Sequence, residues 1–222
     1  MDEAGYGELR QVPKNTGDIR KIGAVIPAAG MSSRMKAFKP LLPCRDSTVI
    51  ECTVGAALKA AQRAVVVLGN HADEVERVLR ERFGDSVTIV RNPDYRDTDM
   101  LYSVQIGLEF LGECDGFFLL PGDMPAVGSD TLHALVEAFD GAHTVIFPSF
   151  NGRKGHPPLI AASLIPAIRS YRGDGGLRAV LNGVPQKVLE LTDKGIMTDL
   201  DTPEDYAAML NNGTLSNHLN HM

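Results

Sequence analysis

Residues 27–42 combine a run of small residues with basic side chains. The segment reads Pro-Ala-Ala-Gly-Met-Ser-Ser-Arg-Met-Lys-Ala-Phe-Lys-Pro-Leu-Leu. Small residues let a backbone approach a phosphate closely, and successive N–H groups can form a nest for an anion. Arg34 offers a planar fork of donors for phosphate oxygens, and Lys39 offers a compact positive charge. The pattern indicates phosphate binding, and a tight strand-to-helix turn with solvated cations is the competing interpretation.

Two carboxylates stand where a bound metal ion would help a phosphate ligand. Asp123 follows an apolar run in Leu-Pro-Gly-Asp-Met-Pro, and Asp201 lies in Asp-Leu-Asp-Thr-Pro-Glu. Mg²⁺ is a hard cation that takes one or two carboxylates and leaves positions for phosphate oxygens. The competing interpretations are that Asp123 fixes a turn between prolines and that Asp201 caps a helix starting at Pro203. Asp199 is the second choice for the second carboxylate.

Two further segments carry polar side chains that suit an anionic ligand. His156 follows the basic loop Asn-Gly-Arg-Lys, and Asp174 and Arg178 lie in Gly-Asp-Gly-Gly-Leu-Arg. The second segment opens a predicted helix, and helix N-termini attract anions. A packed or surface histidine and an ordinary glycine-rich loop are the competing interpretations.

The elements that must position these residues follow an alternating pattern. Short apolar runs, typical of strands buried on both faces, alternate with longer amphipathic stretches, typical of helices. This alternation predicts a mostly parallel, doubly wound sheet, with ligands outside the carboxyl ends of its strands. Thr48 and Glu51 suit a capping box, Ser129 or Asp130 a helix cap, and Pro203 a first helical turn. The predicted strands are 22–27, 64–68, 87–90, 116–120, 144–148 and 186–191, and the predicted helices 48–62, 71–83, 100–111, 129–140, 163–171, 176–182 and 203–210.

Composition and length exclude several classes of protein. A net charge of −6 argues against a broad nucleic-acid surface, and no apolar run is long enough to span a membrane. The acidic N-terminus lacks a secretory leader, and three scattered cysteines favour reduced thiols, so a cytoplasmic location is expected. The dinucleotide G-x-G-x-x-G and Walker patterns are absent from residues 27–42. We expect one domain over 21–210 between polar tails at 1–20 and 211–222, and no particular oligomeric state is indicated.

The motifs together resemble the MobA-like nucleotidyltransferase family, and most of all its molybdenum cofactor cytidylyltransferase branch. The resemblance spans about residues 22–210 and rests on motifs in the expected order. These are Ala-Ala-Gly-Met-Ser-Ser-Arg-Met with Lys-Pro-Leu-Leu, then Leu-Pro-Gly-Asp-Met-Pro, Gly-His-Pro, Gly-Asp-Gly-Gly-Leu-Arg and Asp-Leu-Asp-Thr-Pro-Glu.

The resemblance implies a fold, a reaction and a set of site residues. The fold is a three-layer α/β/α sandwich, Rossmann-like and of the nucleotide-diphospho-sugar transferase type. The reaction moves a nucleoside monophosphate from an NTP to a phosphorylated small molecule such as molybdopterin, with Mg²⁺ (or Mn²⁺) on Asp123 and Asp201. The implied nucleotide-binding residues are Ala28, Ala29, Gly30, Met31, Ser32, Ser33, Arg34, Lys39 and Gly122, the catalytic ones Arg34, Lys39 and Asp123, and the acceptor-binding ones Ser103, His156, Asp174 and Arg178.

Departures from the family pattern leave the acceptor open. Residues 98–103 read Thr-Asp-Met-Leu-Tyr-Ser where a Gly-Met-Ser-Ser-Ser-like stretch is expected, and Lys36 replaces a glycine. The segment also resembles choline-phosphate and sugar-phosphate nucleotidyltransferases, and Tyr95 and Tyr102 suit either ligand stacking or packing. Ala29 replaces a glycine of the guanylyltransferases, which favours CTP over GTP. A non-catalytic nucleotide-binding protein of the same fold is the third hypothesis.

Overall fold

The structure is a computed structural model that describes residues 20–31 and 37–211. Nearly all of the two polar segments predicted to be tails, 1–20 and 211–222, falls outside these ranges, as do the predicted phosphate-binding residues Ser32, Ser33 and Arg34. Among the described residues, no helix has both the length and the apolar character that crossing a membrane would require.

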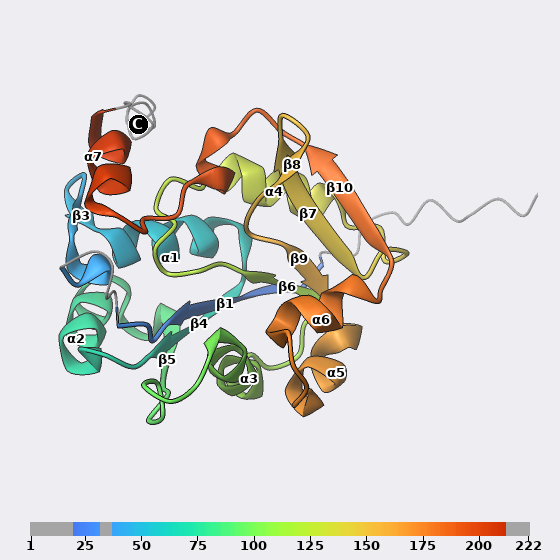
Figure 1. Cartoon of the computed structure of the whole chain (residues 1–222), viewed down its shortest axis with the longest axis horizontal. Helices are drawn as coiled ribbons and strands as arrows, with labels where there is room; N and C mark the ends of the chain where they lie inside the picture. Colours follow the sequence, from blue (N-terminus) through green and yellow to red (C-terminus); the bar gives the residue numbers. More distant parts are fainter. Residues whose placement is uncertain (1–19, 32–36, 212–222) are drawn as a thin grey trace, which may run out of the picture.

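The centre of the fold is a sheet that runs in the order β10-β7-β9-β6-β1-β4-β5 (Figure 1). The pairs β10–β7, β6–β1, β1–β4 and β4–β5 are parallel, whereas β9 is antiparallel to both of its neighbours and β8 is antiparallel to β7. The predicted mostly parallel sheet is thus confirmed. The strands are β1 (Ile22–Ala28), β4 (Arg63–Leu68), β5 (Val87–Arg91), β6 (Gly116–Leu119), β7 (Val145–Phe150), β8 (Arg153–Lys154), β9 (Leu159–Ala161) and β10 (Gln186–Glu190).

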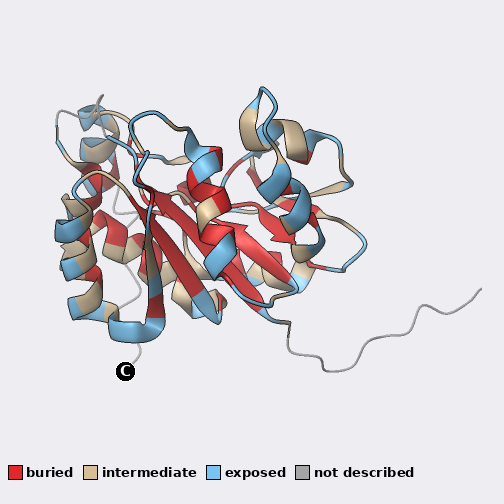
Figure 2. Cartoon of the chain, turned by 90° about the horizontal axis from the view of Figure 1, so that it is seen from below, coloured by how far each residue is buried: buried red, intermediate tan, exposed pale blue. Residues whose placement is uncertain are grey.

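Helices cover both faces of this sheet, which confirms the predicted three-layer arrangement. Alternate residues of β1 explain the layers: Ala24 and Ile26 pack with one helical layer and Val25 with the other. The first layer holds α1 (Val49–Ala60), α2 (Ala72–Phe83) and α4 (Ser129–Ala138), and the second holds α3 (Met100–Phe110), α5 (Ile165–Ser170) and α6 (Gly176–Asn182). Figure 2 shows the buried strands between helices whose outer surfaces are exposed.

A small satellite packs against the N-terminal turn of α1. It consists of the hairpin β2 (Pro43–Cys44) and β3 (Ser47–Thr48) together with α7 (Pro203–Asn211), joined by a buried cluster around Cys44 and Leu200. Four 3-10 turns complete the chain: η1 (Lys39–Leu41), η2 (Gly84–Ser86), η3 (Ala162–Leu164) and η4 (Lys194–Met197).

Local capping chemistry decides where two of the helices begin. Thr48 and Glu51 form the predicted capping box at α1, since each side chain bonds the other residue's backbone N–H. The prediction that Ser129 or Asp130 caps α4 was wrong, because the cap position is Gly128, which has no capping side chain. The carboxylate of Asp193 comes from a distant segment and accepts the Gly128 N–H.

The close contact of α3 with the sheet generates a stability prediction. A Cβ at Gly107 would lie 2.6 Å from Val25 Cγ1, whereas at Gly55 of α1 the nearest atom, in Phe83, would be 3.8 Å away. Both positions are inside helices, so alanine improves helix propensity by about 1 kcal/mol at each. Overpacking costs about 1–3 kcal/mol only at Gly107.

We therefore expect the free energy of unfolding of Gly107→Ala to lie about 2 kcal/mol below that of Gly55→Ala, measured by urea denaturation. Equal stabilities of the two variants would contradict the close packing of α3 on β1.

Candidate active site

A cleft of about 460 Å³ opens at the carboxyl ends of β1 and β6. Its walls come from the segments that follow β1, β5 and β6, from the loop that holds His156, and from the segment before α7. The residues that line the cleft are Pro27, Ala28, Ala29, Gly30, Met31, Lys39, Pro40, Tyr95, Thr98, Asp99, Met100, Ser103, Pro121, Gly122, Asp123, His156, Asp199 and Asp201. The position is the one expected of a ligand site in a doubly wound sheet.

At the floor of this cleft the ammonium of Lys39 lies between two carboxylates. Its Nζ is 3.2 Å from Asp123 Oδ2 and 2.8 Å from Asp201 Oδ1. Lys39 is buried, with 7% of its surface exposed, while the carboxylate side chains are 27% and 29% exposed. The pair of acids therefore faces the cleft and shares one buried cation, which offsets the repulsion between the two charges.

Thr202 and Asp205 form the cap of α7, and the neighbouring Asp201 contacts Lys39. The Thr202 hydroxyl accepts from the Asp205 N–H at 3.2 Å, and the Asp205 carboxylate accepts from the Thr202 N–H at 2.8 Å. This reciprocal arrangement is a capping box with Asp in the place of Glu. The interpretation of Asp201 as the cap before Pro203 is therefore not the observed one.

A latch at η4 brings the segment of Asp201 next to Asp123. Asp193 accepts hydrogen bonds from Gly128 N at 3.0 Å, Thr131 Oγ1 at 2.6 Å and Gly195 N at 2.7 Å. Gly195 lies so close to the loop after β6 that a Cβ would be 2.0 Å from the carbonyl oxygen of Ala126. Beyond the latch, the Leu200 N–H donates to the Asp123 carbonyl at 3.3 Å. We call Asp193, Gly195 and their partners Gly128 and Thr131 the η4 latch.

The same turn fixes the loop that holds His156. The His156 N–H donates to the Ile196 carbonyl at 2.9 Å, which connects this loop to the turn that precedes Asp199 and Asp201. His156 is exposed at the cleft, and the protein atoms packed against its ring remove part of its hydration. This desolvation lowers the pKa of His156, while the charges of Asp199 and Asp123 act in the opposite direction.

The opposite wall is held by the buried amide of Asn92, at the end of β5. Its Nδ2 donates to Thr98 Oγ1 and to Ser103 Oγ, each at 3.0 Å, and its Oδ1 accepts from the Asp94 N–H at 2.9 Å. Asp99 caps α3 by accepting from the Tyr102 N–H at 3.1 Å. This network fixes the loop that carries Tyr95 and Met100 into the cleft.

The structure brings most of the predicted site residues together. Ala28, Ala29, Gly30, Met31 and Gly122 line the cleft beside Lys39 and Asp123, and Ser103 and His156 line it from other walls.

Asp174 and Arg178 do not line the cleft. Asp174 precedes α6 and Arg178 lies in its first turn, and the Tyr171 hydroxyl donates to the Asp174 carbonyl at 2.7 Å. Ser32, Ser33 and Arg34 fall outside the described residues.

Asp193 and Asn92 were missed by reading the sequence. Each acts through a hydrogen bond to a residue distant in the chain or to a loop backbone, and neither lies in a glycine-rich or metal-binding motif. The available signal was an Asp or Asn at the start of a loop or turn, but this signal does not identify the residues to which the side chain bonds.

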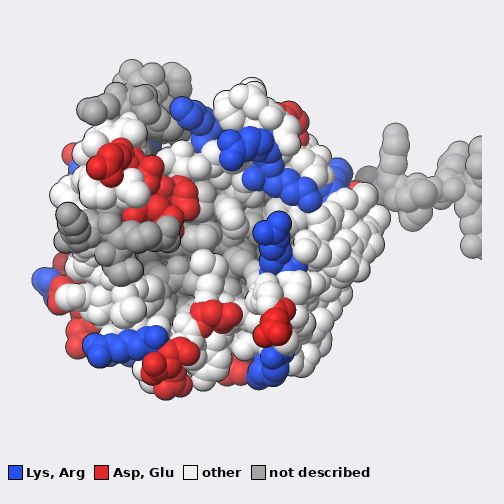
Figure 3. All heavy atoms as spheres, viewed as in Figure 1, with Lys and Arg blue, Asp and Glu red and all other residues white. Residues whose placement is uncertain are grey.

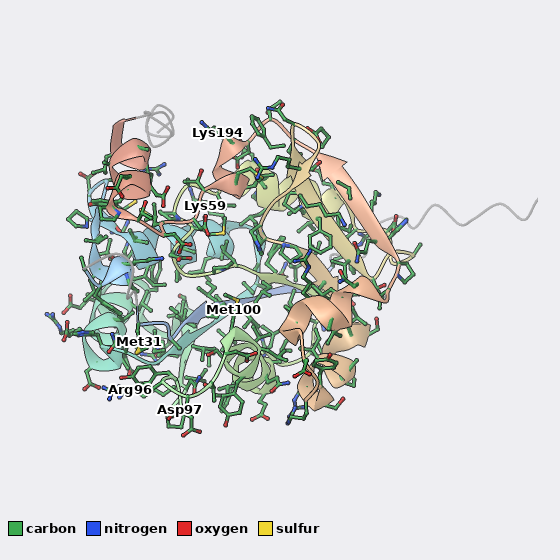
Figure 4. All side chains as sticks on the ribbon, in the orientation of Figure 1. Met31, Lys59, Arg96, Asp97, Met100 and Lys194 are labelled. Atoms are coloured by element: carbon green, nitrogen blue, oxygen red, sulfur yellow. The ribbon has the colours of Figure 1, made fainter. Side chains whose placement is uncertain are left out.

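Charge and apolar surface are distributed unevenly around the cleft. Figure 3 shows acidic side chains on one side of the central hollow and a run of Lys and Arg on the opposite side, over β8 and β10. Met31 and Met100, labelled in Figure 4, are 53% and 55% exposed although both line the cleft. Among the described residues, the cleft thus presents carboxylates, the Lys39 ammonium and flexible apolar side chains, and further cations lie outside its lining.

The donors in the cleft fit a hard divalent cation. Within the ranges 20–31 and 37–211, no group of three or more His, Cys, Asp and Glu could by itself hold a metal ion. Asp123 and Asp201 supply two carboxylates, so a bound ion would take its other ligands from substrate and water, as Mg²⁺ commonly does.

The η4 latch generates a second prediction. Asp193→Ala leaves the partly buried donors of Gly128, Thr131 and Gly195 without their acceptor. We expect the free energy of unfolding to fall by about 1–3 kcal/mol, with a smaller loss in Asp193→Asn, which keeps one acceptor oxygen. Urea denaturation measures both.

The matched control is Asp85→Ala, since Asp85 is fully exposed. A loss in Asp193→Ala no larger than in this control would mean that the latch does not hold the segment.

Comparison with known proteins shows the family of this chain. The MobA-like NTP transferase domain family matches residues 24–190. The molybdenum cofactor cytidylyltransferase of Escherichia coli K12 is 33% identical over 83% of this chain and 93% of its own length. A probable molybdenum cofactor guanylyltransferase of Bacillus cereus is 33% identical over 64% of this chain and 68% of its own length.

Solved structures show the same architecture. A nucleotidyl transferase from Methanothermobacter thermautotrophicus superposes with a TM-score of 0.75 at 30% identity, covering 88% of this chain and 98% of that one. Rv0371c of Mycobacterium tuberculosis, in complex with manganese, superposes with a TM-score of 0.69 at 25% identity, covering 86% and 98%. Fold, cleft and relatives agree, and the chain is a nucleotidyltransferase that belongs to the MobA-like NTP transferase family.

Proposed function

We propose that this enzyme transfers CMP from CTP to a phosphorylated small molecule, with molybdopterin as the preferred acceptor, and releases pyrophosphate. The observation that carries the proposal is the placement of Lys39 between Asp123 and Asp201, at the floor of a cleft that the Ala28–Met31 loop also lines. The cytidylyltransferase relative, similar over nearly its whole length, supports the base and the acceptor.

Each residue has a definite task in this reaction. Asp123 and Asp201 would hold Mg²⁺ or Mn²⁺, which offsets negative charge on the phosphates when bound. Lys39 contributes positive charge beside the carboxylates, and the backbone of Gly30 and Met31 contributes N–H donors to the triphosphate. An oxygen of the acceptor's phosphate attacks the α-phosphorus while the bond to pyrophosphate breaks, so no protein nucleophile is needed and positioning supplies most of the acceleration.

Two walls of the cleft carry polar side chains that suit the acceptor phosphate. The neutral imidazole favoured by the low pKa of His156 can donate to an acceptor phosphate without a net charge. Ser103, held by Asn92, stands on the facing wall. We assign these two residues to the acceptor, and Asp174 and Arg178 are a more remote choice because they lie outside the cleft lining.

A second acceptor class is supported by the wall at 98–103. Only Met100 and Ser103 match the stretch expected there. Asp99 and Met100 both line the cleft, and Met100 is exposed. This apolar, acidic wall is also compatible with choline phosphate or a sugar phosphate. The binding-only alternative is disfavoured because Lys39, Asp123 and Asp201 are all present and in contact.

A matrix of reactions tests the proposal. Four NTPs are combined with molybdopterin, choline phosphate and several sugar phosphates, and pyrophosphate release is measured with and without Mg²⁺. We expect turnover with CTP, molybdopterin and metal together. Asp123→Asn, which keeps the size of the side chain but removes its charge, should lower kcat/KM by at least about a hundredfold.

Asp85→Asn is the matched control, because Asp85 is fully exposed and does not line the cleft. Full activity of Asp123→Asn would remove the assigned metal role, and faster turnover with choline phosphate or a sugar phosphate would transfer the assignment to the second acceptor class.

The choice of base generates a separate prediction at Ala29. Its methyl group narrows the part of the cleft next to Gly30. Because guanylyltransferases of the family carry glycine at this position, we infer that the methyl group disfavours the larger guanine base. We expect Ala29→Gly to raise the ratio of kcat/KM for GTP to that for CTP by about tenfold, the effect of one methyl group in a pocket. An unchanged ratio would place base selection elsewhere.

A further inference from the structure

Cys44 and Cys52 have no task in the proposed reaction, but they lie close to the segments that carry Lys39 and Asp201. Cys44 belongs to β2 and is fully buried, whereas Cys52 lies in the first turns of α1 and is half-buried. The Cys52 Sγ is 3.4 Å from the Cys44 carbonyl oxygen, and both side chains pack in the same buried cluster. The sulfurs are therefore neighbours across the turn that joins the hairpin to α1.

The surroundings favour a thiolate on Cys52 and a protonated thiol on Cys44. The neighbouring Cys44 thiol and the charge of Arg45 lower the pKa of Cys52 to about 7. The neighbouring Cys52 and burial raise the pKa of Cys44.

A buried hydroxyl points to the same sulfur. The Ser47 Oγ is shielded from solvent and, among the described residues, has no hydrogen-bond partner of ordinary geometry. Its proximity nevertheless contributes to the low pKa of Cys52. An otherwise unsatisfied buried hydroxyl has a purpose if it stabilises negative charge on the neighbouring sulfur.

We propose that Cys44 and Cys52 are a redox-active thiol pair that closes to an intramolecular disulfide on meeting a low-molecular-weight disulfide such as glutathione disulfide. The Cys52 thiolate attacks one sulfur of glutathione disulfide and releases one glutathione thiolate. Cys44 then attacks the Cys52 sulfur of the mixed disulfide, and its proton passes to the second glutathione as it leaves. The two protein thiols are oxidised, and one glutathione disulfide is reduced to two glutathione molecules.

The position of the pair connects it to the active site. Cys44 packs in one buried cluster with Leu200, which lies between Asp199 and Asp201. On its other side, the Val49 N–H donates to the Leu42 carbonyl and the Leu42 N–H donates to the Lys39 carbonyl, at 3.0 and 3.1 Å. Disulfide formation draws the two sulfurs to about 2 Å, and a close-packed cluster transmits such a displacement. We therefore expect the oxidised enzyme to be less active.

The test uses the full-length Cys114→Ser variant, which contains only the proposed pair. Matched variants add Cys44→Ala or Cys52→Ser. After incubation with glutathione disulfide at about pH 8, intact masses and peptide maps are recorded without reductant, and circular dichroism verifies that each variant is folded.

The two thiols should give different products. The Cys114→Ser chain should lose the mass of two hydrogen atoms and yield a peptide linked through Cys44 and Cys52. The variant lacking Cys44 should keep one glutathione on Cys52, because no second thiol displaces it. The variant lacking Cys52 should remain unmodified, because Cys44 is buried. An unmodified Cys114→Ser chain, or a stable glutathione adduct in place of the internal bond, would overturn the proposal. The wild-type chain, mapped in parallel, answers the same question if a variant fails to fold.

A second readout depends on the nucleotidyl transfer proposed above, whereas the masses do not. Pyrophosphate release by the oxidised Cys114→Ser chain should fall several-fold and recover fully with dithiothreitol. Unchanged activity of a chain shown to hold the disulfide would overturn the connection to Lys39 and Asp201 and leave the nucleotidyl transfer intact.

Discussion

The contact of one buried ammonium with two carboxylates is the constraint on which the rest of the site depends. Lys39, Asp123 and Asp201 come from three distant parts of the chain and meet at the carboxyl end of the sheet. Two carboxylates that contact one ammonium repel each other, and a buried lysine is costly when it is unpaired. The arrangement offsets both costs and keeps the two carboxylates facing the cleft, where they could hold a divalent ion.

Residues that do not line the cleft hold this contact in place. Parallel pairing of β1 and β6 fixes the loops that carry the segment 28–31 and Asp123. The η4 latch places the segment of Asp201 beside Asp123. Thr202 and Asp205 form the capping box of α7, so Asp201 is not needed as its cap. Asn92 fixes the opposite wall. The loops of the cleft are thereby supported by the sheet and its helices, which explains how their polar side chains keep their positions.

Much of the fold could be read from the sequence, because its signals are local. Each predicted apolar run became a strand and each amphipathic stretch a helix, with boundaries close to those observed. The antiparallel β9 was missed because three residues carry no periodicity, and the cap of α4 was wrong because its partner, Asp193, is distant in sequence. Lys39, Asp123 and Asp201 could be predicted because they lie in local motifs. The residues that hold them in place, such as Asp193 and Asn92, could not be predicted because their role depends on tertiary contacts. The placement of Asp174 and Arg178 beside the cleft, and not in it, is likewise a consequence of how α6 docks.

The central claim is that Asp123 and Asp201 together hold a divalent ion in the presence of nucleotide, and electron paramagnetic resonance of Mn²⁺ tests it most directly. Free Mn²⁺ is titrated against the wild-type chain with CTP and against Asp123→Asn and Asp201→Asn under the same conditions. The account predicts one nucleotide-dependent Mn²⁺ site per chain, weakened by at least about tenfold in each variant, since even supporting residues of a metal site have effects of this size. Mn²⁺ affinities in both variants equal to that of the wild-type chain would contradict it.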